Sequence, residues 1–403
     1  MKKYIRSERA NLFEPNVYIG MIVKLSGDLQ SEEIEQAVYN SYEANEATMS
    51  RVVLEENGDA YYEKMEGSGC KFIIDSCSWK ELLHQSEKRP FALNEGELVR
   101  TFLTKESGQW ILFIHAHHLV GDGQSVLILI NDIVTGMNKL PLTYKSMLSV
   151  NRNFLENRAK LGKGTKLYIK WINQKWQKNA RVFTWDDYYT IHRKYWSEYT
   201  SEIEWITHDI KELKARCPNG ITINSYMITE LVREHSECKV VGIPVSIRED
   251  KGMSNQTSGI AVRYKYNSKR AFEKNANRVH KAIYEKLRNK DMRYFILLFM
   301  EQLCPSLVDA ILMQSYGCYE NELTKKMAKV MGYIGDGGRD LGVTNLNKID
   351  IPSEYERFVI TDIMFVPPKV SYSKKVIGIS TYADRLIVCY HKMTKNLNNR
   401  LQS

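Results

Sequence analysis

The feature that most constrains the fold is a predicted strand, tight turn and helix that follow one another directly. Trp110 to Ala116 is a continuous apolar run of strand length, which predicts a strand covered on both faces. After Gly123, apolar residues recur at helical spacing, at Val126, Leu127, Ile130, Ile133, Val134 and Met137. The residues between these two elements therefore lie at a strand-to-helix junction.

This junction reads His117-His118-Leu119-Val120-Gly121-Asp122-Gly123, and the chain has only nine histidines in 403 residues. If the strand continues to the histidines, its period of two directs His117 and His118 to opposite faces, so one faces a cavity and the other the interior. We expect no metal at His115, His117 and His118, because no carboxylate is suitably placed to complete a ligand set. Asp122 precedes the helix and is predicted to cap it.

Strands and helices alternate in both halves of the chain, which predicts an α/β or α+β fold of two lobes. We place the N-terminal lobe, with the heptapeptide, at residues 1–160 and the C-terminal lobe at 196–403. Residues 161–195 form a basic, aromatic-rich connection between them. Arg51–Leu54 and Ala60–Glu63 predict a hairpin across Asn57-Gly58.

Composition argues against several classes of protein. The seven cysteines form no CxxC pair, which argues against a disulfide framework and a structural zinc site. No signal-peptide core and no spanning apolar window is present, so we expect a cytoplasmic protein. No nucleic-acid-binding module is recognisable. The glycine-rich residues 335–339 lack the Lys-Ser/Thr of a phosphate loop and predict a turn.

The positive charge is concentrated in residues 139–181, where eleven basic residues oppose Glu156 alone. This excess of ten is as large as the chain's net charge of +9. On a helical wheel, Lys163, Lys166, Lys170 and Lys178 lie opposite Tyr168, Ile169, Ile172 and Trp176. Such a helix can lie on an anionic membrane surface or receive an acidic carrier protein or the phosphates of coenzyme A. The plainer interpretation is a helix packed on the core with solvated lysines.

The heptapeptide resembles the HHxxxDG signature of nonribosomal peptide synthetase condensation domains, whose superfamily includes chloramphenicol acetyltransferase and alcohol and wax-ester acyltransferases. Three further segments resemble family motifs in the same order, at Arg89–Arg100 (Pro-Phe…Leu-x-Arg), Gly242–Arg248 (Pro-Val-x-x-Arg) and Gly342–Leu346 (Ser/Thr-Asn-Leu). The family's early Arg-His-x-x-Leu-Arg element is eroded to Asn45-Glu-Ala-Thr-Met-Ser-Arg51, and the basic segment has no clear match. These departures bear on the substrate and not on the fold.

The resemblance implies two chloramphenicol-acetyltransferase-like lobes, each a mixed sheet with flanking helices, forming a V with a central channel. It also implies acyl transfer from a thioester to an amine or hydroxyl acceptor. The donor would be acyl-CoA or the acyl-phosphopantetheine of a carrier protein, with no permanently bound cofactor. His118 would then be the catalytic base, since a neutral imidazole can take the proton of the attacking nucleophile.

The other motif residues have a structural interpretation beside the functional one. We expect His117 to hold the turn by hydrogen bonding, and the resemblance pairs Asp122 with Arg248. Gly123 is either a contributor to an oxyanion site at the helix N-terminus or a turn glycine. By resemblance alone, Asn345 is a second positioning or oxyanion contact; otherwise it is a loop asparagine.

The sequence thus predicts a stand-alone condensation-type acyltransferase. The alternative is a catalytically silent condensation-like module that binds a carrier protein or an anionic membrane surface. A third possibility is peripheral membrane attachment through residues 139–181 that accompanies catalysis on lipid-like substrates. We predict no nucleic-acid partner.

Overall fold

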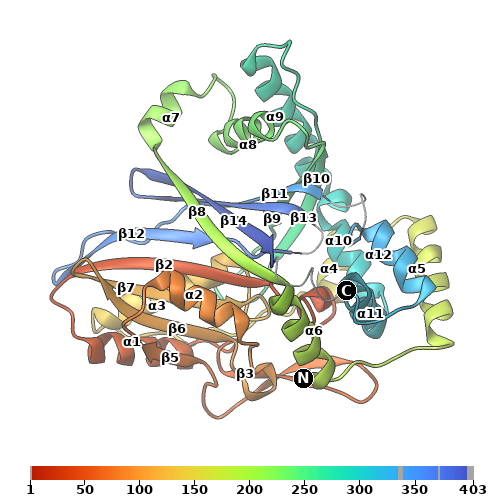
Figure 1. The fold of residues 1–403 in the computed structure, drawn as a ribbon, viewed down its shortest axis with the longest axis horizontal. Coiled ribbons are helices and arrows are strands. Elements are labelled where there is room, and N and C mark those ends of the chain that lie inside the picture. Colours follow the sequence, from red (N-terminus) through yellow and green to blue (C-terminus); the bar gives the residue numbers. More distant parts are fainter. Residues whose placement is uncertain (1, 335–338, 371–372, 397–403) are drawn as a thin grey trace.

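The computed structural model describes residues 2–334, 339–370 and 373–396, in which three sheets carry the architecture (Figure 1). A small sheet has the order β1-β4-β3, with β1 at Lys3–Tyr4, β3 at Ser50–Leu54 and β4 at Ala60–Lys64. β3 and β4 pair antiparallel, and the intervening Gly58 has a φ of 85°, which confirms the predicted hairpin. The turn predicted at 335–339 falls almost wholly outside the described residues.

The five-stranded sheet holds the heptapeptide strand near its centre, in the order β12-β2-β7-β6-β5. Its strands are β2 (Tyr18–Gly27), β5 (Lys71–Ile74), β6 (Val99–Glu106), β7 (Gln109–His117) and β12 (Phe358–Val366). Alternate residues of β7 enter different cores. Leu112 and Ile114 share a core with α1 (Ser31–Glu43) and α3 (Gly123–Met137), whereas Ile111 and Phe113 pack with α2 (Trp79–Lys88). This burial of both faces explains the continuous apolar run of β7.

The six-stranded sheet has the order β10-β9-β11-β13-β14-β8 and lies above the five-stranded sheet in Figure 1. Its strands are β8 (Tyr199–Asp209), β9 (Val240–Ser246), β10 (Thr257–Arg263), β11 (Arg339–Lys348), β13 (Ser373–Tyr382) and β14 (Arg385–Lys395). One face packs on α7 (Ile210–Arg216), α8 (Ile223–Glu234) and α9 (Phe272–Arg288). β11 runs parallel to β9 and β13, and the other pairs are antiparallel, so the sheet is mixed.

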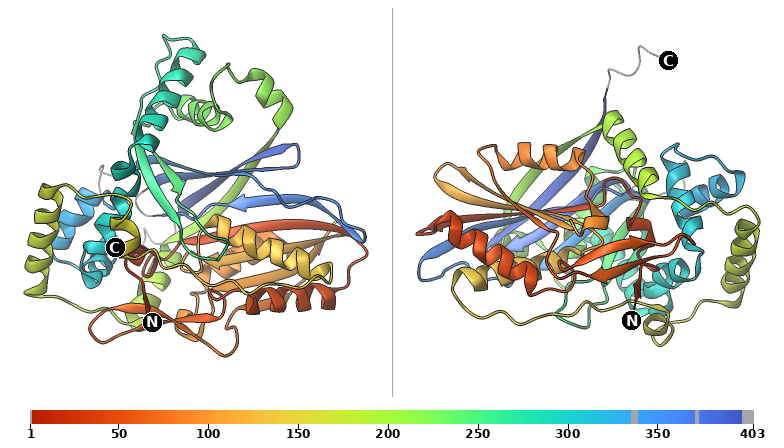
Figure 2. Two further views of the ribbon diagram at one scale, coloured as in Figure 1. Left: turned by 180° about the vertical axis from the view of Figure 1, so that it is seen from behind. Right: turned by 90° about the horizontal axis from the view of Figure 1, so that it is seen from below.

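The remaining helices gather at one side of the molecule, as both views of Figure 2 show. They are α4 (Arg152–Glu156), α5 (Lys163–Gln177), α6 (Trp185–Glu198), α10 (Lys290–Gln302), α11 (Pro305–Ser315) and α12 (Glu322–Met331). Their buried residues belong to the same core as the five-stranded sheet. The buried pair Arg9–Asp309 joins the N-terminal segment to α11, with Arg9 Nε 2.7 Å from Asp309 Oδ1.

The predicted α/β fold of two chloramphenicol-acetyltransferase-like lobes is confirmed by this architecture and by the structural relatives described below. The lobe boundaries stay a prediction, and two parts of the predicted C-terminal lobe pack with the N-terminal one. β12 lies in the predicted C-terminal lobe but pairs with β2 of the N-terminal sheet, from Phe358 opposite Gly27 to Val366 opposite Gly20. Helices α10 to α12 share the N-terminal core.

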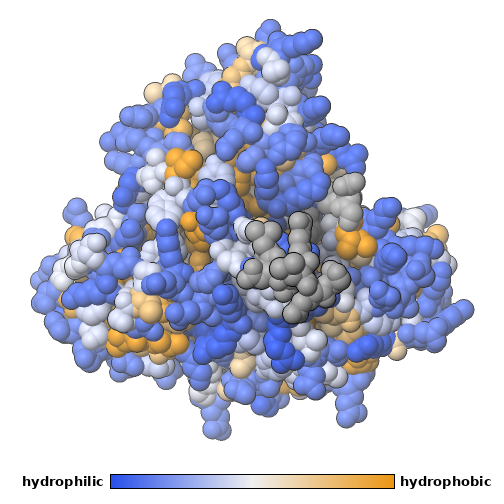
Figure 3. All heavy atoms as spheres, in the orientation of Figure 1, coloured by the Kyte–Doolittle hydropathy of each residue, from blue (hydrophilic) through white to orange (hydrophobic). Residues whose placement is uncertain are grey.

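The basic helix α5 packs as the plainer interpretation expected. Ile169, Ile172 and Trp176 are buried, and Trp176 Nε1 donates to Ser306 Oγ at 2.9 Å. Tyr168 differs from the wheel prediction because its side chain is 37% exposed. The face of the molecule seen in Figure 3 is mainly hydrophilic, with hydrophobic residues in separate small patches.

A helix that crosses a bilayer must be both long enough and apolar enough, and the helices of the described residues can be judged by these two criteria. No single helix meets both criteria; α10 and α11 meet them only together, as a pair bent by 101°.

Candidate active site

The two adjacent histidines of the heptapeptide differ in their surroundings. His117 ends β7, is fully buried, and packs its ring against those of Tyr18 and Phe91. Its Nδ1 accepts a hydrogen bond from the backbone N–H of Leu119 at 3.2 Å, across the turn. Burial lowers the pKa of His117 to about 3, so the ring is neutral at physiological pH. His117 has the geometry of a turn-holding residue.

His118 is partly exposed, unlike the residues on either side of it. Its backbone N–H donates to Val17 O at 3.0 Å, so the strand pairing with β2 fixes its backbone. Burial lowers the pKa of the ring, while the charge of Asp122 and a hydrogen bond to the residue's own backbone oppose that shift. A neutral imidazole is therefore the main form at pH 7, as a general base requires.

His115 lies on the same face of β7 as His117 and joins a buried polar network. Its Nδ1 is 2.7 Å from Ser86 Oγ, which in turn accepts from Arg100 Nη1 at 3.2 Å. Since the Ser86 hydroxyl accepts from Arg100, its own hydrogen is available to His115. Arg100 is fully buried and bonded to Glu97, with Nε 3.0 Å from Oε1. The Arg89–Arg100 motif segment thus places a buried ion pair beside β7, the strand that carries the histidines.

No group of three or more His, Cys, Asp or Glu residues in the described chain is arranged to hold a metal ion.

Asp122 caps α3 and pairs with Arg248 of the other lobe. Its Oδ1 accepts from the Ser125 backbone N–H at 3.0 Å and from Arg248 Nη2 at 2.6 Å. Its Oδ2 accepts from the Gln256 backbone N–H at 3.1 Å and from Thr257 Oγ1 at 2.8 Å. These donors from both lobes hold the carboxylate in a fixed position at the turn. The structure therefore brings together the pair that the resemblance implied.

Gly123 opens α3 where the helix meets β11 of the other lobe. A Cβ on Gly123 would lie 2.6 Å from Leu346 Cδ2, and Gln124 Nε2 donates to Leu346 O at 3.1 Å. The absence of a side chain thus permits this close contact. The neighbouring Asn345 donates from Nδ2 to Asn224 Oδ1 at 3.0 Å and accepts from the Asn347 N–H at 2.7 Å. Its oxygen is engaged, and a primary amide keeps a second N–H donor.

The N-terminal segment contributes residues that the sequence did not single out. Asn11 Nδ2 lies 3.5 Å from His118 Nδ1. Tyr62 Oη lies 2.9 Å from Glu8 Oε1 and 2.8 Å from Leu119 O. Tyr62 has a single hydroxyl hydrogen, so both contacts are hydrogen bonds when Tyr62 donates to Leu119 O and a protonated Glu8 donates to Tyr62 Oη. Burial raises the pKa of Glu8 to about 7, which fits this arrangement.

The sequence model of the condensation domain matches residues 14–220, which is half of the chain. The chain belongs to the condensation-domain family. Comparison with curated proteins by sequence found no match.

Several solved structures share the fold at low sequence identity. The first condensation domain of the CDA synthetase is 12% identical, with a TM-score of 0.63, over 97% of this chain and 92% of that one. A starter condensation domain of rhizomide synthetase, solved with C8-CoA and Leu-SNAC, is 10% identical, with a TM-score of 0.60, over 96% and 85%. An epimerization domain of tyrocidine synthetase B is 14% identical, with a TM-score of 0.62, over 97% and 91%. The fold is therefore shared by domains of more than one activity.

Proposed function

We propose that this protein is a stand-alone acyltransferase that moves an acyl group from a thioester to an amine or a hydroxyl. The observation that carries the proposal is His118, a partly exposed residue that is flanked by buried ones at the point where β7 meets α3, and whose imidazole burial keeps neutral at pH 7. The solved rhizomide synthetase domain binds C8-CoA, which supports a coenzyme A thioester as one donor. The acyl-phosphopantetheine of a carrier protein is the other.

In the proposed reaction the acceptor's nitrogen or oxygen attacks the thioester carbonyl while His118 takes its proton. The new C–N or C–O bond gives a tetrahedral intermediate, whose oxyanion can be stabilised by donors near Gly123 and Asn345. The C–S bond then breaks, and the protonated His118 returns the proton to the thiolate. Atoms and charges balance without any redox partner.

The test is thioester turnover by the purified chain and by His118→Ala. Acyl-CoA donors of graded chain length are offered with amine and alcohol acceptors, and products are detected by mass spectrometry. The wild type is expected to form product and His118→Ala to lose at least about a hundredfold in rate, within the range attributed to general bases. His118→Ala should unfold at the wild-type temperature. Undiminished turnover in that folded variant refutes the role of His118.

A second candidate is a catalytically silent module that binds an acidic carrier protein or an anionic membrane. It is favoured by α5, where Leu167 and Trp171 are 68% and 51% exposed beside lysines. In the eroded early motif, Arg51 bonds to Glu63 on the surface, with Nε 2.7 Å from Oε2. Capture of an acyl carrier protein, without product from any thioester, supports this candidate. Liposome co-sedimentation that survives replacement of the α5 lysines argues against the membrane role of residues 139–181.

A further inference from the structure

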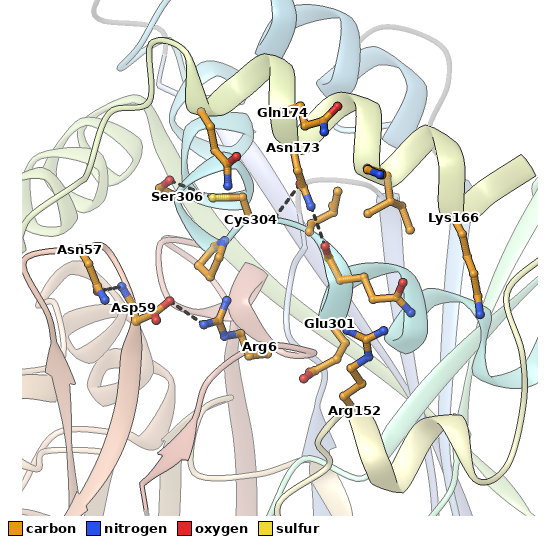
Figure 4. A pocket seen from close by; sticks show the side chains of 16 residues that line it. Arg6, Asn57, Asp59, Arg152, Lys166, Asn173, Gln174, Glu301, Cys304 and Ser306 are labelled. Atoms are coloured by element: carbon orange, nitrogen blue, oxygen red, sulfur yellow. Dashed lines mark hydrogen bonds and ion pairs between the residues drawn. The ribbon is translucent and has the colours of Figure 1, made fainter. Parts of the chain in front are cut away.

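A cavity of about 550 Å³ lies between α5, the turn that joins α10 to α11, and the N-terminal segment (Figure 4). Four basic residues line it, and they come from three separate parts of the chain: Arg6 from the N-terminal segment, Arg152 from α4, and Lys166 and Lys170 from α5. The two lysines are one helical turn apart and exposed, so they present adjacent ammonium groups.

The acidic residues of the cavity offset only part of this charge. Asp59 pairs with Arg6, with Oδ1 2.8 Å from Nη2, and so neutralises that one cation. Glu301 is largely buried, and burial raises the pKa of its carboxyl to about 7 against the opposing charge of Arg6. At neutral pH about half of the Glu301 carboxyls are therefore protonated, so Glu301 can supply an O–H donor and carries only part of a negative charge.

Two polar atoms of the lining are buried without a hydrogen-bond partner among the described residues, Glu301 Oε2 and Gln302 Nε2. Neighbouring polar groups are engaged: Asn173 Nδ2 donates to Gln302 O at 2.8 Å, and Asn173 Oδ1 accepts from the Cys304 N–H at 2.9 Å. Buried polar atoms usually have partners, so such a pair beside a cavity indicates a ligand or water that would bond to them.

We propose that this cavity binds a phosphate-bearing small molecule. Phosphate oxygens are acceptors only, and they match the ammonium groups, the Gln302 amide and a protonated Glu301. The volume is that of an ordinary small-molecule site and would hold a nucleotide-sized ligand. The phosphates of a coenzyme A species and those of a free phosphorylated metabolite share this chemistry. The proposal does not depend on acyl transfer, because the cavity can bind phosphate whether or not His118 is a base.

The experiment is isothermal titration of the full chain at low salt with coenzyme A, inorganic pyrophosphate and the uncharged pantetheine. Coenzyme A and pyrophosphate should bind, and any binding of pantetheine, which the thioester site near His118 could provide, should be the same in all variants. Lys166→Ala/Lys170→Ala should weaken binding at least about fivefold, as expected for two phosphate contacts. Lys163→Ala/Lys175→Ala is the matched control, because it removes the same charge from the same helix outside the cavity lining. It should bind as the wild type does.

Glu301→Gln provides an independent check at pH 8, where the carboxyl is mostly ionised and opposes an anion. The amide cannot ionise, so this variant should bind coenzyme A and pyrophosphate more tightly than the wild type. Tighter binding of coenzyme A than of pyrophosphate identifies a coenzyme A species, and equal binding identifies the phosphate group alone. Absence of binding by both anions, or equal weakening in both lysine double variants, overturns the proposal. Weaker binding by Glu301→Gln also overturns it.

Discussion

The contact between Asp122 and Arg248 holds the heptapeptide turn to the other lobe, and its energy can be measured with a double-mutant cycle. The side chains are 5% and 14% exposed, so each is largely removed from water. Asp122→Ala leaves the Arg248 guanidinium without its carboxylate, at a cost of about 3 to 5 kcal/mol. It also removes the cap of α3, which adds about 1 kcal/mol.

Arg248→Ala should cost less, because Asp122 keeps its bonds to the Ser125 and Gln256 backbone N–H groups and to Thr257 Oγ1. The loss also includes the bond from Arg248 Nη1 to Gly252 O. We expect about 2 to 3 kcal/mol, since an ionised partner is left with several donors. In the double variant no charge is stranded, so its loss should fall short of the sum by about 1.5 to 3 kcal/mol.

The assay is urea unfolding of the wild type, the two single variants and the double variant, with the free energy of unfolding extrapolated to water. The slope of this free energy against urea concentration should be the same in all four, which shows that each exposes the same surface area on unfolding. The control cycle uses Arg152 and Glu156, an exposed pair 2.9 Å apart on one helix, where coupling of about 0.5 kcal/mol or less is expected. Additive losses for Asp122 and Arg248, within about 0.5 kcal/mol, would refute the argument that the pair braces the turn.

Three further perturbations follow from other contacts. Gly123→Ala should lower the free energy of unfolding by about 1 to 2 kcal/mol in urea, because its Cβ would lie 2.6 Å from a leucine Cδ2 on β11 that must move. Arg9→Met should cost about 3 to 5 kcal/mol in the same assay, and adding Asp309→Leu should recover most of it, since the pair is 1% exposed on both sides. For Glu8, a folded pKa raised to about 7 means that stability is full below the unfolded pKa and is lost as the pH rises through 7. Glu8→Gln should therefore reduce the fall in melting temperature between about pH 4 and pH 8, a range that includes both the unfolded value of 4.5 and the folded pKa of about 7; an unchanged fall contradicts a protonated Glu8.

The local geometry of the heptapeptide could be predicted from sequence because it depends on near neighbours. β7 ends at His117, which is buried, and His118 follows it in the turn and is partly exposed, so the two histidines differ in burial, although the strand does not include both. The cap at Asp122 follows from its position before a helix. The contact with Arg248 lies 126 residues away, and only the family resemblance indicated it.

The rest of the site depends on tertiary contacts that no local pattern records. Tyr62 contacts both Glu8 and Leu119, and this contact joins the N-terminal segment, the β3–β4 hairpin and the heptapeptide turn. The hairpin could be predicted from the sequence, but its position beside the turn could not. No local pattern indicates that β12 lies beside β2. That pairing joins positions more than 300 residues apart, and hydrophobicity alone does not choose the partner strand.

The contrast between the two ends of the heptapeptide bears on how such a turn can act. At one end, Asp122 has backbone and side-chain donors on both carboxylate oxygens, which fixes the turn. At the other end, the His118 ring lies 3.5 Å from Asn11 Nδ2, a distance too long for a strong hydrogen bond. Its backbone is instead held through Val17 O. A base must exchange protons during each turnover, so it is best positioned by its backbone and by a rigid neighbouring turn rather than by strong bonds to its own ring.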